Sequence, residues 1–169
     1  MHKVNKNFIE NKLHFLIQSI LVVVFMALVL LPLGSIKADV VTAIGASTLA
    51  ASVFILFALP NSPVAAIHRV IGAYFIALVL GILWHYIYMK VNTNITNHPL
   101  ALDLCGAFAV GTTVLIMALF DLIHPPTVGF SLALVIGPWN HYTIYVVIVA
   151  VIVLCLIKIS LKNWFINLL

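Results

Sequence analysis

The sequence predicts an all-α polytopic membrane protein built from two repeats, each with a membrane span, a broken short half-helix and a second span. Three observations support this fold class. Of the 169 residues, 64% are hydrophobic and only 7% are charged, which excludes a soluble globular domain. Four apolar runs are long enough to cross a bilayer core. Two further apolar runs are interrupted by glycine or proline, so each is expected to supply only a short helix.

The basic residues stand singly at the ends of the apolar runs rather than in a cluster. They are Lys3, Lys6, Lys12, Lys37, Arg69, Lys90, Lys158 and Lys162. This spacing is typical of residues that fix membrane topology, not of a nucleic-acid surface. We therefore expect a single transmembrane domain over residues 1–169, with the lipid bilayer as partner and no nucleic-acid partner.

The first repeat is predicted to cover about residues 14–90 and to begin and end with full-length spans. The first span, over about residues 14–34, is longer than the core of a secretory signal peptide and should remain a membrane helix. The second span, over about residues 67–89, carries small residues at intervals of four. Such a stripe lets helices approach closely, and it could serve internal packing or a homo-oligomer.

The apolar run between these spans, residues 40–60, contains the break Gly45-Ala46-Ser47-Thr48. Glycine is flexible, and serine and threonine are good N-cap residues. We therefore predict extended chain to about Gly45 and a half-helix over about residues 47–59.

The second repeat, about residues 100–163, is predicted to follow the same order. A span over about residues 100–123 leads to His124-Pro125-Pro126. A half-helix then runs to Gly137, where Gly-Pro stops it, and a last span covers about residues 143–159.

The double proline dictates the backbone at the second break. Each proline disfavours the helical region for the residue before it, so the chain ahead of Pro126 should be extended. Pro126 itself suits the first position of a helix. The first free N–H groups, on Thr127, Val128 and Gly129, would then lie at the positive end of a helix dipole, where an anion can bind.

The relative direction of the repeats depends on whether the short segments cross the membrane. If they cross, the chain makes six crossings, the repeats are inverted and both termini lie on the same side. If they are re-entrant, the chain makes four crossings and the repeats are parallel. Counting basic residues does not decide between these arrangements. We favour inversion, because only then do two half-helix N-termini face each other near the midplane.

Together these motifs resemble the HPP family of integral membrane proteins. The resemblance rests on His124-Pro125-Pro126 after a span, preceded by Gly45-Ala46-Ser47, by Pro60-Asn61-Ser62-Pro63 and by Arg69-Val70-Ile71-Gly72. Some members of the family are described as nitrite transporters of plastids and cyanobacteria. The resemblance therefore implies a transporter of a small anion such as nitrite.

The predicted substrate-binding residues come from the two breaks. They are Gly45, Ala46, Ser47 and Thr48 in the first, and His124, Pro125, Pro126, Thr127, Val128 and Gly129 in the second. An ionisable residue at membrane depth is usually functional, but the imidazole could instead satisfy backbone carbonyls freed by the break. The hydroxyl groups could contact substrate or simply cap helices. The glycines could allow close approach of a ligand or close packing.

Arg69 and Asp121 are candidates for a gate or vestibule. The arginine could attract anions, pair with Asp121 or anchor the interface. The aspartate, one turn before His124, could also orient that imidazole or merely mark the end of the span.

The leading hypothesis is a channel or transporter for a small monovalent inorganic anion, held at the facing half-helix N-termini. It needs neither a metal nor another cofactor, and it is not an enzyme. The alternatives are a membrane metal or haem protein that uses His85, His124 and His141, or a structural membrane protein. We expect an integral protein of the bacterial cytoplasmic (inner) membrane with a cytoplasmic N-terminus.

Overall fold

The computed structural model describes residues 11–34, 40–94, 99–137 and 141–168, and every regular element in these ranges is helical. The elements are α2 (Lys12–Gly34), α3 (Val40–Ala58), the short 3-10 helix η1 (Pro63–Ala65), α4 (Ile67–Asn94), α5 (Pro99–Leu119), α6 (Pro126–Ile136) and α7 (His141–Ser160). Helices α2, α4, α5 and α7 are long and apolar enough to cross a membrane, and α3 and α6 contain shorter apolar stretches. The predicted all-α polytopic fold is confirmed.

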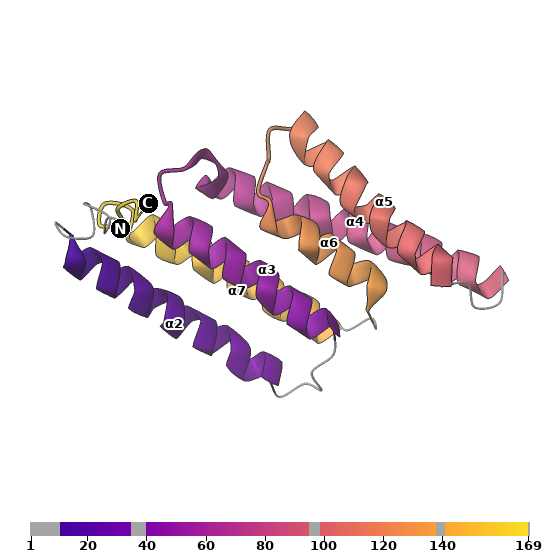
Figure 1. Cartoon of the computed structure of the whole chain (residues 1–169), viewed down its shortest axis with the longest axis horizontal. Coiled ribbons are helices and arrows are strands. Elements are labelled where there is room, and N and C mark those ends of the chain that lie inside the picture. The colour runs from indigo at the N-terminus through magenta and orange to yellow at the C-terminus, as the bar shows by residue number, and fades with distance from the viewer. Residues whose placement is uncertain (1–10, 35–39, 95–98, 138–140, 169) are drawn as a thin grey trace, which may run out of the picture.

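Successive helices run in alternating directions, so the two halves of the chain are inverted (Figure 1). Helices α2, α4 and α6 lead away from the end of the bundle where α2 begins and α7 ends, and α3, α5 and α7 return to it. We call this the termini end. The opposite directions of α2–α3–α4 and α5–α6–α7 agree with the inverted arrangement favoured from the sequence.

The packing between helices has the same symmetry. The packed pairs are α2 with α3, α2 with α7, α3 with α6, α3 with α7, α4 with α5, α4 with α6, α4 with α7, and α5 with α6. Exchanging α2 with α5, α3 with α6 and α4 with α7 reproduces this whole set. The short helices α3 and α6 therefore occupy equivalent central places, where they pack on each other.

The predicted break in the first short helix is wrong, because α3 is continuous from Val40 to Ala58. The hydroxyl of Ser47 donates to the carbonyl of Ala43 at 2.9 Å, and that of Thr48 donates to Gly45 at 2.8 Å. Both side chains thus bond back into their own helix instead of capping a new one. Gly45 lies inside the helix and faces α7, where an added Cβ atom would be in ordinary contact with Val147 at 3.6 Å, so this glycine marks no turn.

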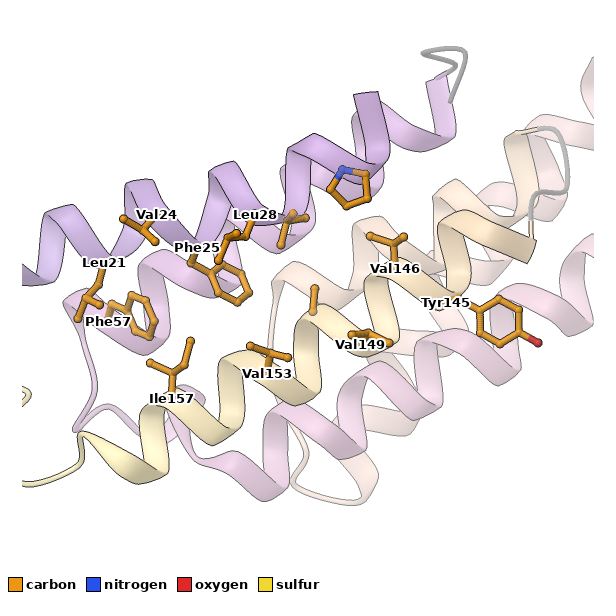
Figure 2. Close-up of a pocket in the computed structure, with 13 residues that line it drawn as sticks. Leu21, Val24, Phe25, Leu28, Phe57, Tyr145, Val146, Val149, Val153 and Ile157 are labelled. Atoms are coloured by element: carbon orange, nitrogen blue, oxygen red, sulfur yellow. The ribbon is translucent and has the colours of Figure 1, made fainter. Parts of the chain in front are cut away.

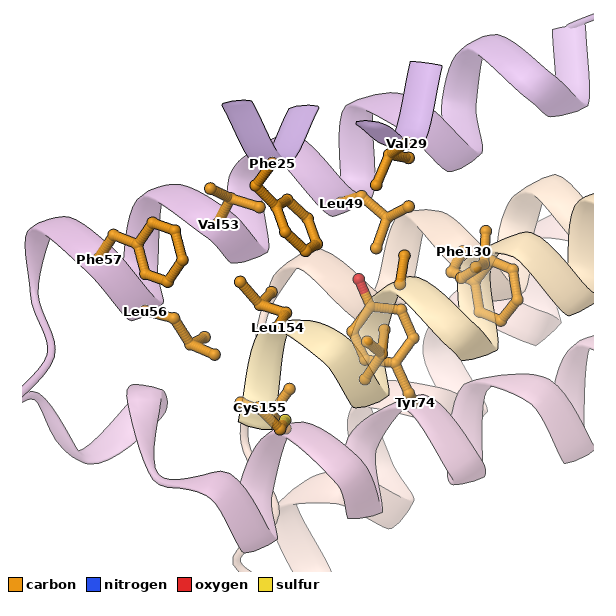
Figure 3. Close-up of a cluster of buried hydrophobic side chains, with 14 of the residues drawn as sticks. Phe25, Val29, Leu49, Val53, Leu56, Phe57, Tyr74, Phe130, Leu154 and Cys155 are labelled. Atoms are coloured by element: carbon orange, nitrogen blue, oxygen red, sulfur yellow. The ribbon is translucent and has the colours of Figure 1, made fainter. Parts of the chain in front are cut away.

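The core lies where α2, α3 and α7 meet α4 and α6 (Figure 3). Phe57 and Leu49 of α3 and Leu154 of α7 are fully buried. The approach of α6 to α4 requires a glycine at position 81, because a Cβ atom there would lie 2.7 Å from the side chain of Leu134. This contact is one use of the small-residue stripe predicted on the span over residues 67–89.

Candidate functional site

The chain between α5 and α6 begins with a Schellman motif that ends α5. Leu122 N–H donates to the carbonyl of Met117 at 2.9 Å, and Asp121 N–H donates to that of Ala118 at 3.3 Å. Asp121 therefore has a positive φ of 53°, a conformation that aspartate tolerates better than most residues. The motif satisfies the last carbonyls of α5 and turns the chain back into the bundle.

Asp121 pairs with Arg69 at the start of α4. The Nη2 atom of Arg69 lies 2.6 Å from Oδ2 of Asp121, and the aspartate side chain is 74% exposed. The pair joins the two halves of the chain at the termini end. The sequence left more than one role open for both residues. In the structure the arginine pairs with Asp121, and the aspartate does not contact the imidazole of His124.

The start of α6 differs from the prediction in two respects. Pro125 has φ −53° and ψ −36°, which is helical rather than extended. The N–H groups of Thr127 and Val128 donate to the carbonyls of His124 and Pro125, each at 3.2 Å. The hydroxyl of Thr127 also donates to the carbonyl of His124, at 2.7 Å. The first turn of α6 is thus closed on itself and offers these two amide groups to no ligand.

His124 is fully buried at the contact between the two halves of the molecule. Its Nδ1 atom lies 2.8 Å from the carbonyl oxygen of Val64 in η1, and its Nε2 atom lies 3.0 Å from the hydroxyl of Ser52 in α3. A carbonyl only accepts, so Nδ1 carries a proton. In the neutral imidazole Nε2 is then the acceptor, and the Ser52 hydroxyl donates to it.

Ser52 connects this imidazole to two further groups. Its hydroxyl lies 2.9 Å from the hydroxyl of Tyr74 in α4 and 3.0 Å from the carbonyl of Thr48. When His124 is neutral, Ser52 donates to Nε2 and can accept from Tyr74. When His124 is protonated, Nε2 donates to Ser52, which can turn its own proton to Thr48. We call Thr48, Ser52, Tyr74, His124 and Val64 the polar chain; it satisfies the imidazole in both protonation states.

Burial lowers the pKa of His124 below its ordinary value of 6.5, and the nearby charge of Lys158 acts in the same direction. The hydrogen bond to Val64 opposes these effects. His124 lies in a connection outside the candidate spans, under η1. The imidazole is therefore held neutral at pH 7, but its hydrogen-bond partners can accommodate a proton.

The other predicted site residues lie around the polar chain or away from it. Thr48 is buried and packs on Gly129, where a Cβ atom would lie 2.8 Å from Cγ2 of the threonine. Ser47 is exposed on the outer side of α3, while Ala46 is half-buried. The two helices therefore meet near Thr48 and Gly129, and the helix starts do not face each other, since α3 begins eight residues before Thr48.

The histidines of the alternative hypothesis do not come together. His124 lies at the termini end, whereas His85 lies in the far part of α4 and lines a cavity with Gly137. His141 is the first residue of α7, also at the far end. Among the residues that the structure describes, no group of three or more His, Cys, Asp or Glu side chains could hold a metal ion.

Of the polar chain, Tyr74 lines an apolar cavity of about 230 Å³, whereas His124 and Ser52 line none of the four cavities described here. One of them, of about 420 Å³, is an apolar groove between α2 and α7 with Phe57 of α3 at its base (Figure 2). Its walls are aliphatic and aromatic, and the hydroxyl of Tyr145 is the one side-chain polar group among the residues that line it. A second, of about 360 Å³, opens at the termini end and is partly polar. The structure is therefore closed around His124.

A protein-family model described as the HPP transmembrane region matches residues 9–168 of the chain. The chain belongs to the HPP family. No curated protein and no solved structure matches it. The histidine and two prolines of the family's name correspond here to His124, Pro125 and Pro126. The buried imidazole and the start of α6 are therefore the segment that carries the family motif.

Sequence reasoning missed three members of the HPP protein's polar chain, which are Ser52, Tyr74 and the carbonyl of Val64, and its buried lysine. Ser52 and Tyr74 lie in largely apolar helices. Their hydroxyl groups were a signal, because a buried polar atom at membrane depth needs a partner. Lys158 was predicted only as an interfacial anchor, yet it is 8% exposed and donates to the carbonyl of Ala65.

Proposed function

We propose that this HPP protein transports a small monovalent anion of the nitrite class together with a proton. The observation that carries the proposal is the position of His124, a buried imidazole that is bonded across the contact between two inverted halves. Inverted halves that meet at a central site are the usual architecture of secondary transporters. A buried ionisable group between the two halves, with partners for both of its protonation states, suits a proton carrier.

The contact between halves supplies a means of opening the site. Ser52, Tyr74 and Val64 belong to the first half, and His124 belongs to the second. A rocking movement of one half against the other would separate these partners and admit a ligand between them. In the closed structure the protein's own groups occupy one another's hydrogen bonds.

The proton and the anion would bind together, because each increases the affinity of the site for the other. An imidazolium at His124 provides a positive charge in a site of low dielectric constant, and an anion beside it raises the pKa of the imidazole. By linkage, protonation increases anion affinity by the same factor. The hydroxyl groups of Ser52 and Tyr74 would complete the anion's hydrogen bonds. In this proposal the hydroxyl groups bind the anion in place of the facing half-helix N-termini that the sequence predicted.

The distribution of basic residues supports an orientation with the termini in the cytoplasm of a bacterial cell. Lys12, Arg69, Lys158 and Lys162 all belong to the termini end, and of the described basic residues only Lys90 belongs to the other. Cytoplasmic ends are enriched in basic residues. A cysteine introduced at Lys162 should react with an impermeant maleimide in inverted membrane vesicles but not in intact cells. The reverse labelling would refute this orientation.

The transport proposal is tested with purified protein in proteoliposomes. Uptake of nitrite should exceed that of empty liposomes and should increase when the outside is made more acidic than the lumen. His124→Ala should abolish uptake, whereas His68→Ala should retain it, since His68 is an exposed histidine at the same end of the molecule. The absence of wild-type uptake for nitrite and nitrate, or full uptake by the His124 variant, would refute the proposal.

A further inference from the structure

A cavity of about 360 Å³ lies at the termini end, between the turn that precedes η1 and the end of α7. It is lined by Pro60, Asn61, Ile67, Lys158, Ile159, Lys162 and Phe165. We call it the lysine cavity. Its volume corresponds to roughly ten water molecules, so it can hold a small hydrated ion.

The lysine cavity contains a positive charge that no carboxylate of the described residues neutralises. Lys158 is 8% exposed, and the hydrogen-bond partner of its ammonium group among the described residues is the carbonyl of Ala65. The two carboxylates in the described ranges are elsewhere: Asp121 pairs with Arg69, and Asp103 lies near the start of α5, at the far end. A buried ammonium group with a single neutral partner has donors left for an anion.

The lysine cavity and the polar chain lie on either side of one short segment. The carbonyl of Val64 accepts a hydrogen bond from His124, and the next carbonyl, that of Ala65, accepts one from Lys158. Both carbonyls belong to η1, which packs on α3 and α4. The segment is therefore held by two basic side chains, one from the connection before α6 and one from α7.

We propose that the lysine cavity is an anion-binding vestibule, with Lys158 as its principal ligand, and that η1 separates the vestibule from the polar chain. The proposal rests on the transport function proposed above, and it identifies the site at the termini end where the transported anion would bind first. A small oxyanion would bind to the ammonium group of Lys158, with Lys162 and the side-chain amide of Asn61 as further donors. Because the anion would compete with Ala65 for Lys158, its binding would loosen η1 above His124.

The binding test uses the full chain in detergent with sodium nitrite and sodium nitrate as probes and sodium gluconate as the ionic-strength control. Nitrite should raise the melting temperature of the wild type beyond the gluconate control. Lys158→Met should weaken the apparent affinity tenfold or more, as loss of a charged hydrogen bond does. Lys162→Met should weaken it about twofold to threefold, since that side chain is exposed. Lys90→Met, at the other end of the molecule, should leave it unchanged.

Lys158→Arg is the variant that retains the charge if Lys158→Met fails to fold. It should bind nitrite within about threefold of the wild type, and Lys162→Glu should weaken binding more than Lys162→Met does. Equal affinity in the wild type and in all Lys158 and Lys162 variants that fold would overturn the vestibule.

Transport kinetics separate this inference from the proposed function. If His124→Ala abolishes nitrite uptake while the lysine variants transport with an unchanged KM, transport stands and the vestibule is refuted. If no anion is transported but nitrite binds in a Lys158-dependent way, the binding site stands and the transport function fails. A raised KM in Lys158→Met and Lys162→Met with an unchanged maximal rate supports both.

Discussion

His124 and Ser52 lie 72 residues apart in the sequence, and their side chains approach to 3.0 Å between Nε2 and Oγ. The contact joins the second half of the molecule to the first at a depth where both side chains are fully buried. The double proline after His124 fixes the imidazole from its side, and helix α3 holds the Ser52 hydroxyl 3.0 Å from both Nε2 and the carbonyl of Thr48. This contact is the point at which movement of the halves would be coupled to a proton.

Stability should decrease as the pH falls below about 6.5, and His124 should be responsible. Its pKa is lowered in the folded state, so the unfolded chain binds the proton more readily, and the free energy of unfolding falls with pH. The effect should begin near the unfolded pKa of about 6.5 and grow down to the lower folded value. Thermal melts in detergent between pH 5 and 8 measure it. His124→Gln should flatten the curve in this window; an unchanged slope would assign the effect to another group.

Gly129 should be intolerant of a side chain, in contrast to Gly111. A Cβ atom at position 129 would lie 2.8 Å from Thr48, so α3 and α6 would have to separate. We expect Gly129→Ala to cost about 1–3 kcal/mol. Gly111 has no heavy atom within 4 Å of an added Cβ atom, and Gly111→Ala should cost nothing or stabilise α5 by about 0.5–1 kcal/mol. Equilibrium unfolding in mixed detergent micelles compares them, and equal effects would contradict the packing described for Thr48.

The pair between Arg69 and Asp121 should contribute little to stability. The aspartate side chain is 74% exposed, so Asp121→Asn should reduce the free energy of unfolding by only about 0.2–1 kcal/mol, and less in high salt. Asparagine tolerates the positive φ of this position, so the substitution isolates the charge. Asp103→Asn is the matched control. A loss above 2 kcal/mol, measured by unfolding at two salt concentrations, would mean that the pair is shielded from solvent.

Gln18 should hold the C-terminal segment on the bundle. Its Nε2 atom donates to the carbonyls of Phe57 at 2.6 Å and Ile166 at 2.9 Å, and the side chain is fully buried. Gln18→Leu should cost about 1–3 kcal/mol because it leaves these carbonyls with fewer donors. It should also make the chain after Leu161 more sensitive to limited proteolysis. Ser19→Ala, at the adjacent exposed position, should change neither property. Normal protease resistance of the Gln18 variant would show that other contacts suffice.

The sequence alone determined the features that depend on local chemistry. Its composition indicated a membrane protein, because every long segment is apolar enough to insert into a lipid bilayer. The helix of the second half begins at Pro126 and ends at Ile136, before Gly137, where the sequence predicted its limits. The fixed φ of proline suits the first turn of a helix and Gly-Pro cannot continue one, so these limits do not need the rest of the fold. The predicted effect of Pro126 on the residue before it was wrong, because Pro125 is helical.

Only the tertiary structure decided the continuity of α3 and the make-up of the site. Gly45 and Thr48 resemble a helix break in sequence, but the contact of Gly45 with α7 and the bond of Thr48 to its own helix remove the reason for one. The partner of His124 is 72 residues away, and that of Lys158 is 93 residues away. A polar group in an apolar helix signals that it needs a partner, but packing of distant helices selects which one.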